Sequence, residues 1–205
     1  MNTNQRNLLE YDVCSKLRNN LVCESFKKVD RKLFVPQRWV KYAYSDNAIP
    51  LGSDSSISQP SLVAEMIDLL DLKGSEHVLE IGTASGYSCA ILSLCCKEVD
   101  TIEIDSGLAS SAKKRLAGLG FKNITVHAGD GSLGLPKKAP FDAVVVTAAV
   151  KKIPKPLISQ LKAGGRMVVP VVSDESDFQE LFVCFKKRNK LDCKPVTVVK
   201  FVPLV

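Results

Sequence analysis

From residue 76 onward the chain repeats one pattern, in which a short apolar run is followed by a helical stretch and then by another apolar run. The runs at 77–81, 99–104, 124–127, 141–146 and 166–172 are typical of strands buried on both faces in a parallel sheet. Helices are predicted at 85–97, 105–119 and 154–161, the last of them ended by Gly164 and Gly165. This alternation predicts an α/β fold with right-handed crossovers.

Further segments frame this core. Residues 179–185 and 196–202, separated by a basic turn at 186–190, predict an antiparallel hairpin that closes the sheet. Residues 2–45 have apolar residues at helical spacing, residues 46–60 are polar and turn-rich, and Pro60 suits the first turn of the next helix. We therefore expect a Rossmann-like, doubly wound, mostly parallel sheet with a C-terminal antiparallel hairpin and an N-terminal helical cap.

The length of 205 residues allows one hydrophobic core without disulfides or metals. We expect a single domain over residues 1–205, with the cap and a lid in 1–60 and the core in 61–205. The longest apolar stretches are far shorter than the roughly 20 residues of a membrane span, and residues 1–20 are too polar for a signal peptide. The sequence therefore predicts a cytoplasmic protein with no membrane partner.

The cysteines and histidines restrict the possible chemistry. The two histidines, His77 and His127, lack ligand spacing to any cysteine, so no metal is expected. Their scarcity also argues against a hydrolase with a Ser-His or Cys-His pair. The seven cysteines are odd in number and contain no C-x-x-C pair, so we expect small buried side chains in a reducing compartment. They are Cys14, Cys23, Cys89, Cys95, Cys96, Cys184 and Cys193.

The charge balance gives no sign of nucleic-acid binding. The chain has 28 Lys and Arg against 22 Asp and Glu, which leaves a net charge of +6. These basic residues are scattered, and aromatic residues make up only 6% of the chain. We therefore expect no nucleic-acid partner.

A glycine-containing turn joins the first predicted strand of the core to its helix. Residues 80–87 read EIGTASGY, and open α/β sheets bind ligands at the carboxyl ends of their strands. The spacing G-x-A-x-G lacks the third glycine of the dinucleotide signature G-x-G-x-x-G, and Glu80 precedes it. The turn therefore predicts a ligand site for which phosphate is not the obvious ligand, and it argues against a nicotinamide oxidoreductase.

Two more carboxylates follow the next two strands. Glu103 ends the second strand, where such sheets place a carboxylate against a ribose diol. Asp130, in the turn at 129–131, is suitably placed to accept a hydrogen bond from an exocyclic amine. Together with Glu80, these residues predict a nucleoside site whose ligand has a cationic rather than an anionic tail.

Several stretches of the sequence carry a family resemblance. They are VLEIGTASGY at 78–87, GDG at 129–131, APFDAVVVTAA at 139–149, LKAGGR at 161–166, FVPLV at 201–205 and the more specific ISQP at 57–60. With these stretches the chain resembles the protein-L-isoaspartate O-methyltransferases. The resemblance implies S-adenosyl-L-methionine as the cofactor and methyl transfer to the free α-carboxylate of L-isoaspartyl residues, which initiates repair of damaged proteins through a succinimide.

The resemblance also implies the roles of single residues. Ser58 matches the active-site serine, which lies beside the sulfonium and the substrate carboxylate. The implied cofactor contacts are Ser56, Ile57, Glu80, Gly82, Thr83, Gly86, Glu103, Asp130 and Gly131. The implied substrate contacts are Ser58, Val146, Thr147, Ala148, Val202 and Leu204. The implied partners are isoaspartyl peptides and proteins in extended conformation, bound by a monomer under a substrate lid.

Two positions depart from the family pattern. The family usually has a glycine where Ala84 stands, and the added methyl group is tolerable if φ is negative. Asp54 is in the lid, where its carboxylate could repel an anionic substrate. These departures motivate one alternative, an inactive relative that binds the cofactor and serves as an interaction module. A small-molecule methyltransferase is a second alternative, although it would need a different lid.

Ser58 also has a structural interpretation. It precedes Pro60 and a helical stripe, a position where serine is favoured as an N-cap. In the implied reaction its hydroxyl would orient the substrate rather than act as a nucleophile. No general base is needed, because an α-carboxylate with an ordinary pKa of about 3.3–3.7 is already ionised at neutral pH.

Overall fold

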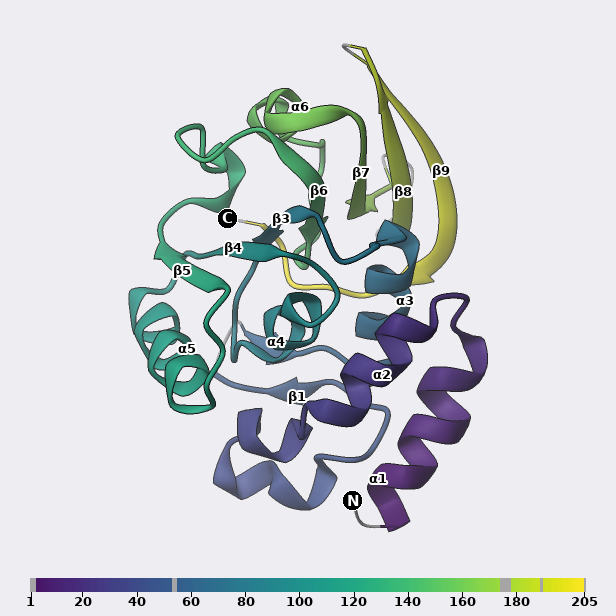
Figure 1. The fold of residues 1–205 in the computed structure, drawn as a ribbon, viewed down its shortest axis with the longest axis vertical. Helices are drawn as coiled ribbons and strands as arrows, with labels where there is room; N and C mark the ends of the chain where they lie inside the picture. Colours follow the sequence, from purple (N-terminus) through teal and green to yellow (C-terminus); the bar gives the residue numbers. More distant parts are fainter. Residues whose placement is uncertain (1–2, 53–54, 174–177, 189, 205) are drawn as a thin grey trace.

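The computed structural model describes residues 3–52, 55–173, 178–188 and 190–204. Its centre is a seven-stranded sheet in the order β5-β4-β3-β6-β7-β8-β9 (Figure 1). The five strands from β3 to β7 are parallel, whereas β8 and β9 form an antiparallel hairpin at one edge, which confirms the predicted fold class. The strands are β3 (His77–Ile81), β4 (Glu98–Glu103), β5 (Ile124–Ala128), β6 (Phe141–Val146), β7 (Leu161–Val172), β8 (Gln179–Lys187) and β9 (Lys190–Val199).

The strand boundaries differ from the prediction on the hairpin side. Helix α6 (Lys155–Gln160) ends before the two glycines, and Gly164 and Gly165 lie inside β7. Strand β9 begins at Lys190 rather than at residue 196, because residues 190–194 alternate exposed and half-buried positions as a strand on the surface does. In the sequence, the polar members of this segment hide the alternation, so it resembles a turn and a loop.

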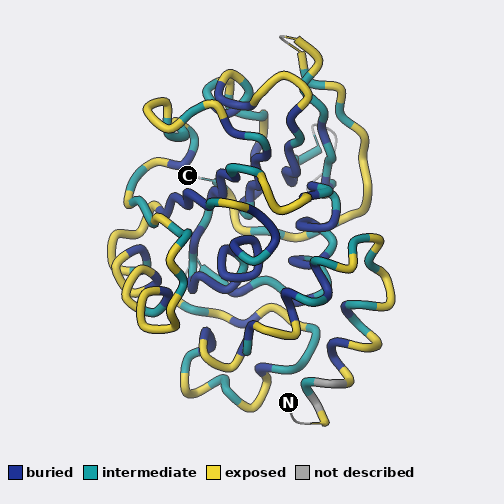
Figure 2. Tube along the Cα trace, in the orientation of Figure 1, coloured by how far each residue is buried: buried dark blue, intermediate teal, exposed yellow. Residues whose placement is uncertain are grey.

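The sheet separates two apolar clusters. Alternate residues of β3 point to opposite faces, so that Val78 belongs to the cluster under α3 (Pro60–Leu70) and α4 (Tyr87–Ser93), and Leu79 belongs to the cluster on the α6 side. Helix α5 (Ser106–Gly118) packs against β4 and β5. Figure 2 shows the central strands buried and the outer helices and hairpin exposed at their surfaces.

The N-terminal part is a series of short helices rather than a few long ones. They are α1 (Thr3–Asn7), the π-helix η1 (Leu8–Val13), the 3-10 helix η2 (Cys14–Lys16), α2 (Asn20–Lys28), and the 3-10 helices η3 (Arg31–Phe34) and η4 (Gln37–Tyr42). Leu8 and Phe26 join the same apolar cluster as α3 and α4, so this part packs against these two helices as the predicted cap. The single domain and its division at residue 60 stay predictions. None of the described helices has the length and hydropathy needed to cross a membrane.

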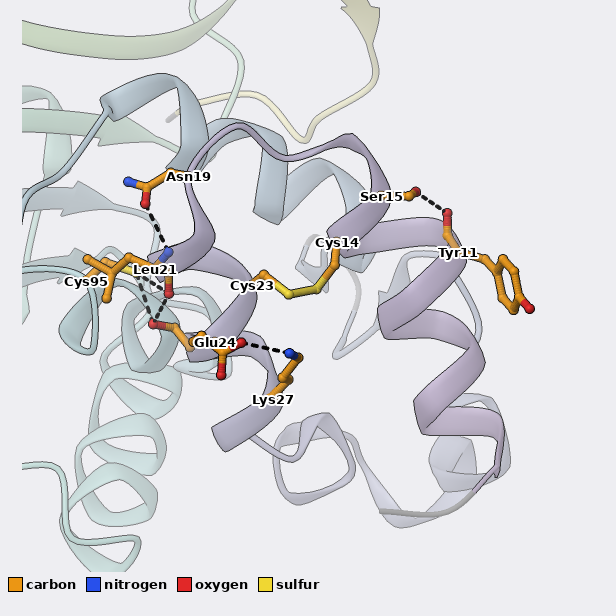
Figure 3. Close-up of a disulfide and its surroundings, with 10 residues drawn as sticks. Tyr11, Cys14, Ser15, Asn19, Leu21, Cys23, Glu24, Lys27 and Cys95 are labelled. Carbon is orange, nitrogen blue, oxygen red and sulfur yellow. Dashed lines mark hydrogen bonds and ion pairs between the residues drawn. A yellow bond between two sulfur atoms is a disulfide. The ribbon is translucent and has the colours of Figure 1, made fainter.

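The expectation of seven unpaired cysteines is wrong. Cys14 and Cys23 form a disulfide that joins η2 to α2 (Figure 3), and Cys184 and Cys193 form another. The second pair lies opposite each other in the β8–β9 register, a relation that depends on hairpin boundaries the sequence did not predict correctly. The remaining cysteines, Cys89, Cys95 and Cys96, are buried thiols.

Candidate active site at the carboxyl ends of the strands

A cavity of about 710 Å³ lies where β3, β4 and β6 end. We call the segments that carry its lining residues at 81–85, 102–105, 131 and 147–148 its floor, and the described residues of 43–59 its roof. The C-terminal segment 200–204 also lines the cavity. Of the predicted site residues, the structure brings together in its wall Ser56, Ser58, Gly82, Glu103, Gly131, Thr147, Ala148, Val202 and Leu204.

The first turn of the floor requires glycine. Gly82 has a φ of +98°, and a Cβ there would lie 2.3 Å from Oγ1 of Thr147. The Gly82 N–H donates to the carbonyl of Ile102 at 2.8 Å, while the Thr147 hydroxyl donates to the carbonyl of Ile81 at 2.9 Å. The turn is therefore tied to both neighbouring strands and leaves backbone, not side chain, facing the cavity.

Glu103 is fixed by backbone donors. Its Oε2 accepts from the Ala84 N–H at 2.7 Å and its Oε1 from the Asp105 N–H at 3.1 Å. Ala84 has a φ of +48°, so the condition of a negative φ is not met. The left-handed conformation costs about 1–2 kcal/mol for a residue with a Cβ, and here the Ala84 N–H is hydrogen-bonded to the Glu103 carboxylate.

Glu80 lies beneath the floor instead of in the cavity wall. It is fully buried, and its Oε2 accepts from the Thr101 hydroxyl at 2.7 Å. The Thr101 hydroxyl has only one proton, which it donates to Glu80. The Thr83 hydroxyl, whose Oγ1 lies 2.7 Å from Oγ1 of Thr101, must therefore donate to Thr101. Burial raises the pKa of Glu80 from 4.5 to about 7, against the opposing effect of the Thr101 hydrogen bond. Glu80 and Thr83 are thus placed to support the turn from below.

Four other predicted residues lie outside the wall. Ile57 and Val146 point into the two apolar clusters, and Gly86 is the N-cap of α4 with a φ of +87°. Asp130 is exposed, and its Oδ1 accepts from the Ser132 N–H at 2.8 Å at the start of the 3-10 helix η5 (Gly131–Leu133). Their contacts with a ligand stay predictions.

The roof is held by one buried arginine that the sequence analysis missed. Arg31 is 1% exposed, and its Nη1 donates to the carbonyls of Ala43 at 3.2 Å and Ser45 at 3.0 Å. Its Nη2 donates to the carbonyls of Asn47 at 2.9 Å and Ser58 at 3.0 Å. Burial lowers the pKa of Arg31. The sequence offered no signal for this role, because Arg31 stands between Asp30 and Lys32 and nothing singles it out as the charged residue of the three that is buried.

Ser58 follows the strand pair of β1 (Ile49–Pro50) and β2 (Ser56–Ile57) and lines the cavity. Its cap interpretation is wrong, because Gln59 occupies the N-cap of α3 and the Ser61 N–H donates to Oδ1 of Asp46 at 2.8 Å. In the part of the chain that the structure describes, the Ser58 hydroxyl has no hydrogen-bond partner, although its carbonyl is bound to Arg31. The hydroxyl is therefore available to a ligand.

The cavity wall includes further residues that the sequence analysis did not select. Ile104 is 53% exposed and lies beside Glu103, so it offers an apolar surface next to a carboxylate. Asp105 adds a second carboxylate, and Lys200 is the only lysine or arginine among the described lining residues. An apolar residue directly after a strand-end carboxylate was the signal for Ile104. Asp54 lies outside the described residues.

The tail that carries Val202 and Leu204 is tied to the sheet. The Ala149 N–H donates to the carbonyl of Val202 at 2.8 Å, and the Leu204 N–H donates to the carbonyl of Ala149 at 2.8 Å. The backbone of Ala149 is therefore occupied by the chain itself. Side chains of Ala148, Val202 and Leu204 remain in the cavity wall.

A second polar cluster lies away from the cavity, on β3, β4 and β5. Asp100 is fully buried, and its two oxygens lie 2.7 Å from Nε2 of His77 and 2.6 Å from Nε2 of His127. Ligand atoms of His77, Asp100 and Glu98 also lie within 4.8 Å of one another. This grouping contains no cysteine, so the spacing of histidines to cysteines in the sequence could not predict it.

Comparisons with known proteins identify the family of this chain. Residues 3–205 match the sequence model of the protein-L-isoaspartate(D-aspartate) O-methyltransferase family. The chain belongs to this family. Among relatives, protein-L-isoaspartate O-methyltransferase 2 of Shewanella sediminis is 46% identical over 188 residues, which are 92% of this chain and 77% of that one. The O-methyltransferase of Dictyoglomus turgidum is 44% identical over 200 residues, which are 98% and 90% of the two chains.

Solved structures of the same family share the fold. A protein-L-isoaspartate O-methyltransferase superposes with a TM-score of 0.87 at 29% identity over 98% of this chain, which spans 64% of that longer one. A protein from Plasmodium falciparum described as a putative member, in complex with S-adenosyl-L-homocysteine, superposes with a TM-score of 0.83 at 19% identity, over 100% and 99% of the two chains. The second comparison supports the fold alone.

Proposed function

We propose that this protein-L-isoaspartate O-methyltransferase family member transfers a methyl group from S-adenosyl-L-methionine to the free α-carboxylate of L-isoaspartyl residues. The observation that carries the proposal is the free Ser58 hydroxyl in a cavity that also holds Glu103 and the Gly82 turn. Family membership supplies the reaction, and the cavity supplies a place where cofactor and substrate meet.

The cavity fits the proposed cofactor in size and in chemistry. Its volume of about 710 Å³ lies within the range of small-molecule sites. Gly82 and Gly131 line the cavity without a side chain, so their backbone can be approached closely by a ligand. The carboxylates of Glu103 and Asp105 suit a ligand with hydroxyl donors and positive charge, and Ile104 offers an apolar surface for a base.

When bound, the cofactor supplies an electrophilic methyl group on a sulfonium. The residues of this chain then have to bind and orient the attacking carboxylate and exclude water. Ser58 donates a hydrogen bond to that carboxylate, and Arg31 holds Ser58 in place through its carbonyl. Lys200 contributes positive charge that attracts an anionic substrate to the cavity. The substrate carboxylate is already ionised, so the mechanism assigns no residue to proton removal.

The experiment compares radiolabelled methyl transfer to an isoaspartyl peptide and to its normal aspartyl twin. We expect base-labile label on the isoaspartyl peptide only. Ser58→Ala should lower turnover by about 10–100-fold because it removes one positioning contact, while affinity for S-adenosylhomocysteine stays unchanged. Ser110→Ala, an exposed serine on α5, is the matched control. Cofactor binding without any label would instead support the inactive relative, and unchanged turnover of Ser58→Ala would remove Ser58 from the mechanism.

The cytoplasmic location and the monomeric state are also proposals. Disulfides are rare in reducing compartments, so the two cysteine pairs test the location directly. Alkylation of the protein in freshly lysed, denatured cells should find seven thiols if the pairs are reduced in the cell, but only three if they persist. Three thiols would contradict the proposed location.

A further inference from the structure

A second cavity, of about 940 Å³, lies between the N-terminal helices, α3 and the end of β9. Residues 196–200 form one side of it and residues 12–18 another. We call it the β9 groove. This volume is large enough for a segment of polypeptide.

The β9 groove adjoins the candidate active site. Gln59, Leu62 and Lys200 line both cavities, so the two lie on either side of the same three residues. One stretch of chain also runs along both, because residues 196–200 line the groove and residues 200–204 line the active-site cavity. These nine residues span roughly 30 Å at the rise of an extended chain.

The strand along the groove has a free edge. Among the described strands, β9 pairs with β8 alone, and it ends the order of the sheet. Its residues 196–199 are Val, Thr, Val and Val, which favour extended structure. The unpaired amides and carbonyls of such an edge can accept an additional strand.

Exposed apolar side chains follow the same path. Phe178 is 67% exposed, Val198 64% and Val196 39%, and all three line the β9 groove. Ile104 and Val202, also exposed, line the active-site cavity. Exposed apolar residues that gather along one path mark a binding surface more than scattered ones do.

The charges of the groove are balanced. Its cationic residues are Lys16, Arg18 and Lys200, and its acidic residues are Asp12, Glu65 and Asp68. Arg18 and Asp68 already bind each other at 3.1 Å. A groove with no dominant charge does not select for an acidic or a basic segment.

From these observations we propose that the β9 groove binds the part of the substrate chain that flanks the isoaspartyl residue, in extended conformation along residues 196–204. The proposal rests on the proposed function. Main-chain pairing and apolar contact depend little on the sequence of the bound segment, so a groove of this kind accepts polypeptides of varied sequence. The groove then adds affinity for polypeptides without changing the site of methyl transfer.

The test uses isoaspartyl peptides with no, four or eight residues added on either the N-terminal or the C-terminal side. With the wild-type protein we expect KM to fall about tenfold on extension in one of the two directions, at constant kcat. Val198→Asp should abolish this gain while leaving turnover of the shortest peptide unchanged. Leu119→Asp, which changes another exposed apolar residue at the end of α5, should retain the gain.

Several outcomes would overturn the proposal. A KM that does not depend on peptide length, or a Val198→Asp variant that keeps the full gain, would show that the groove does not bind the substrate chain. Dimerisation of the wild type in sedimentation, lost in Val198→Asp, would assign the edge of β9 to a second copy. Failure to methylate even the shortest isoaspartyl peptide would contradict the proposed function instead. Anisotropy of labelled long peptides, with S-adenosylhomocysteine bound, gives a readout independent of turnover.

Discussion

The floor and the roof of the cavity are built in opposite ways. The floor is an extension of the parallel sheet, in which backbone hydrogen bonds such as Gly82 N–H to Ile102 and Thr147 N–H to Ile81 tie each turn to its neighbour. The roof has only the two-residue strands β1 and β2, and four of the carbonyls in residues 43–58 depend on Arg31. The floor therefore has many small supports, whereas the roof depends on one side chain.

The largest effect should come from removing that side chain. Arg31→Leu leaves four carbonyls without their donor, and we expect the free energy of unfolding to fall by about 4 kcal/mol and turnover to fall at least 100-fold. Arg115→Leu is the floor counterpart, since Arg115 donates to the single carbonyl of Ser85 at 2.8 Å, and it should cost only about 1 kcal/mol. Urea unfolding and methyl transfer measure both variants. Equal losses would contradict the contrast between roof and floor.

A single substitution in the floor should have the next largest effect on stability. Gly82→Ala combines a φ of +98° with a Cβ 2.3 Å from the Thr147 hydroxyl, and we expect a loss of about 3 kcal/mol together with weaker cofactor binding. Gly120→Ala has a similar φ of +84° but no atom within 4 Å of its Cβ, so it should cost about 1 kcal/mol. Thermal unfolding with and without S-adenosylhomocysteine separates the two contributions. A Gly82→Ala loss no larger than that of Gly120→Ala would show that the close contact is relieved at no cost.

The floor should also respond to pH through Glu80. Its pKa of about 7 exceeds 4.5, so the folded chain binds more protons than the unfolded chain between these values, and stability falls as pH rises through this window. Glu80→Gln removes this dependence and should be more stable relative to wild type at pH 8 than at pH 5.5 by about 2 kcal/mol. Urea unfolding at the two pH values measures the difference. The same difference at both values would mean that Glu80 titrates normally in the folded state.

The smallest expected effect is a gain in stability. Ala84→Gly relieves a left-handed alanine, partly offset by the greater freedom of glycine in the unfolded chain, and we expect about 0.5–1 kcal/mol of added stability. Methyl transfer should change less than twofold, because the Ala84 N–H to Glu103 remains. A large gain in turnover would show that Ala84 limits activity, which is the concern behind the inactive-relative alternative.

The same contrast separates what the sequence could predict from what it could not. The strands of the floor were predicted within about one residue because their buried, β-branched runs carry a direct signal. Glu103 follows from strand-end topology, whereas Gly131 came only from the family resemblance. The roof gave no such signal. Arg31 bonds to carbonyls 12 to 27 residues away, and no periodicity records contacts of that kind. Glu80 could be placed at a strand but not beneath the floor, because its orientation depends on the pleat.

The predictions for the hairpin boundaries and for the cysteines were wrong for a related reason. The alternation at 190–194 is carried by lysine and aspartate as well as by Leu191 and Cys193, so a search for apolar runs passes over it. Without that register the Cys184–Cys193 pair cannot be recognised. Counting cysteines therefore could not replace knowing which of them lie opposite each other.

The tied C-terminal tail has a practical consequence for handling the protein. Leu204 lines the cavity, and its N–H donates to the carbonyl of Ala149 at 2.8 Å. An affinity tag at the C-terminal end would therefore follow closely on a residue of the cavity wall and crowd the entry of a protein substrate. Helix α1, which lies beside the N label in Figure 1, contributes none of the described residues of the cavity wall, so a tag at that end would leave the wall undisturbed.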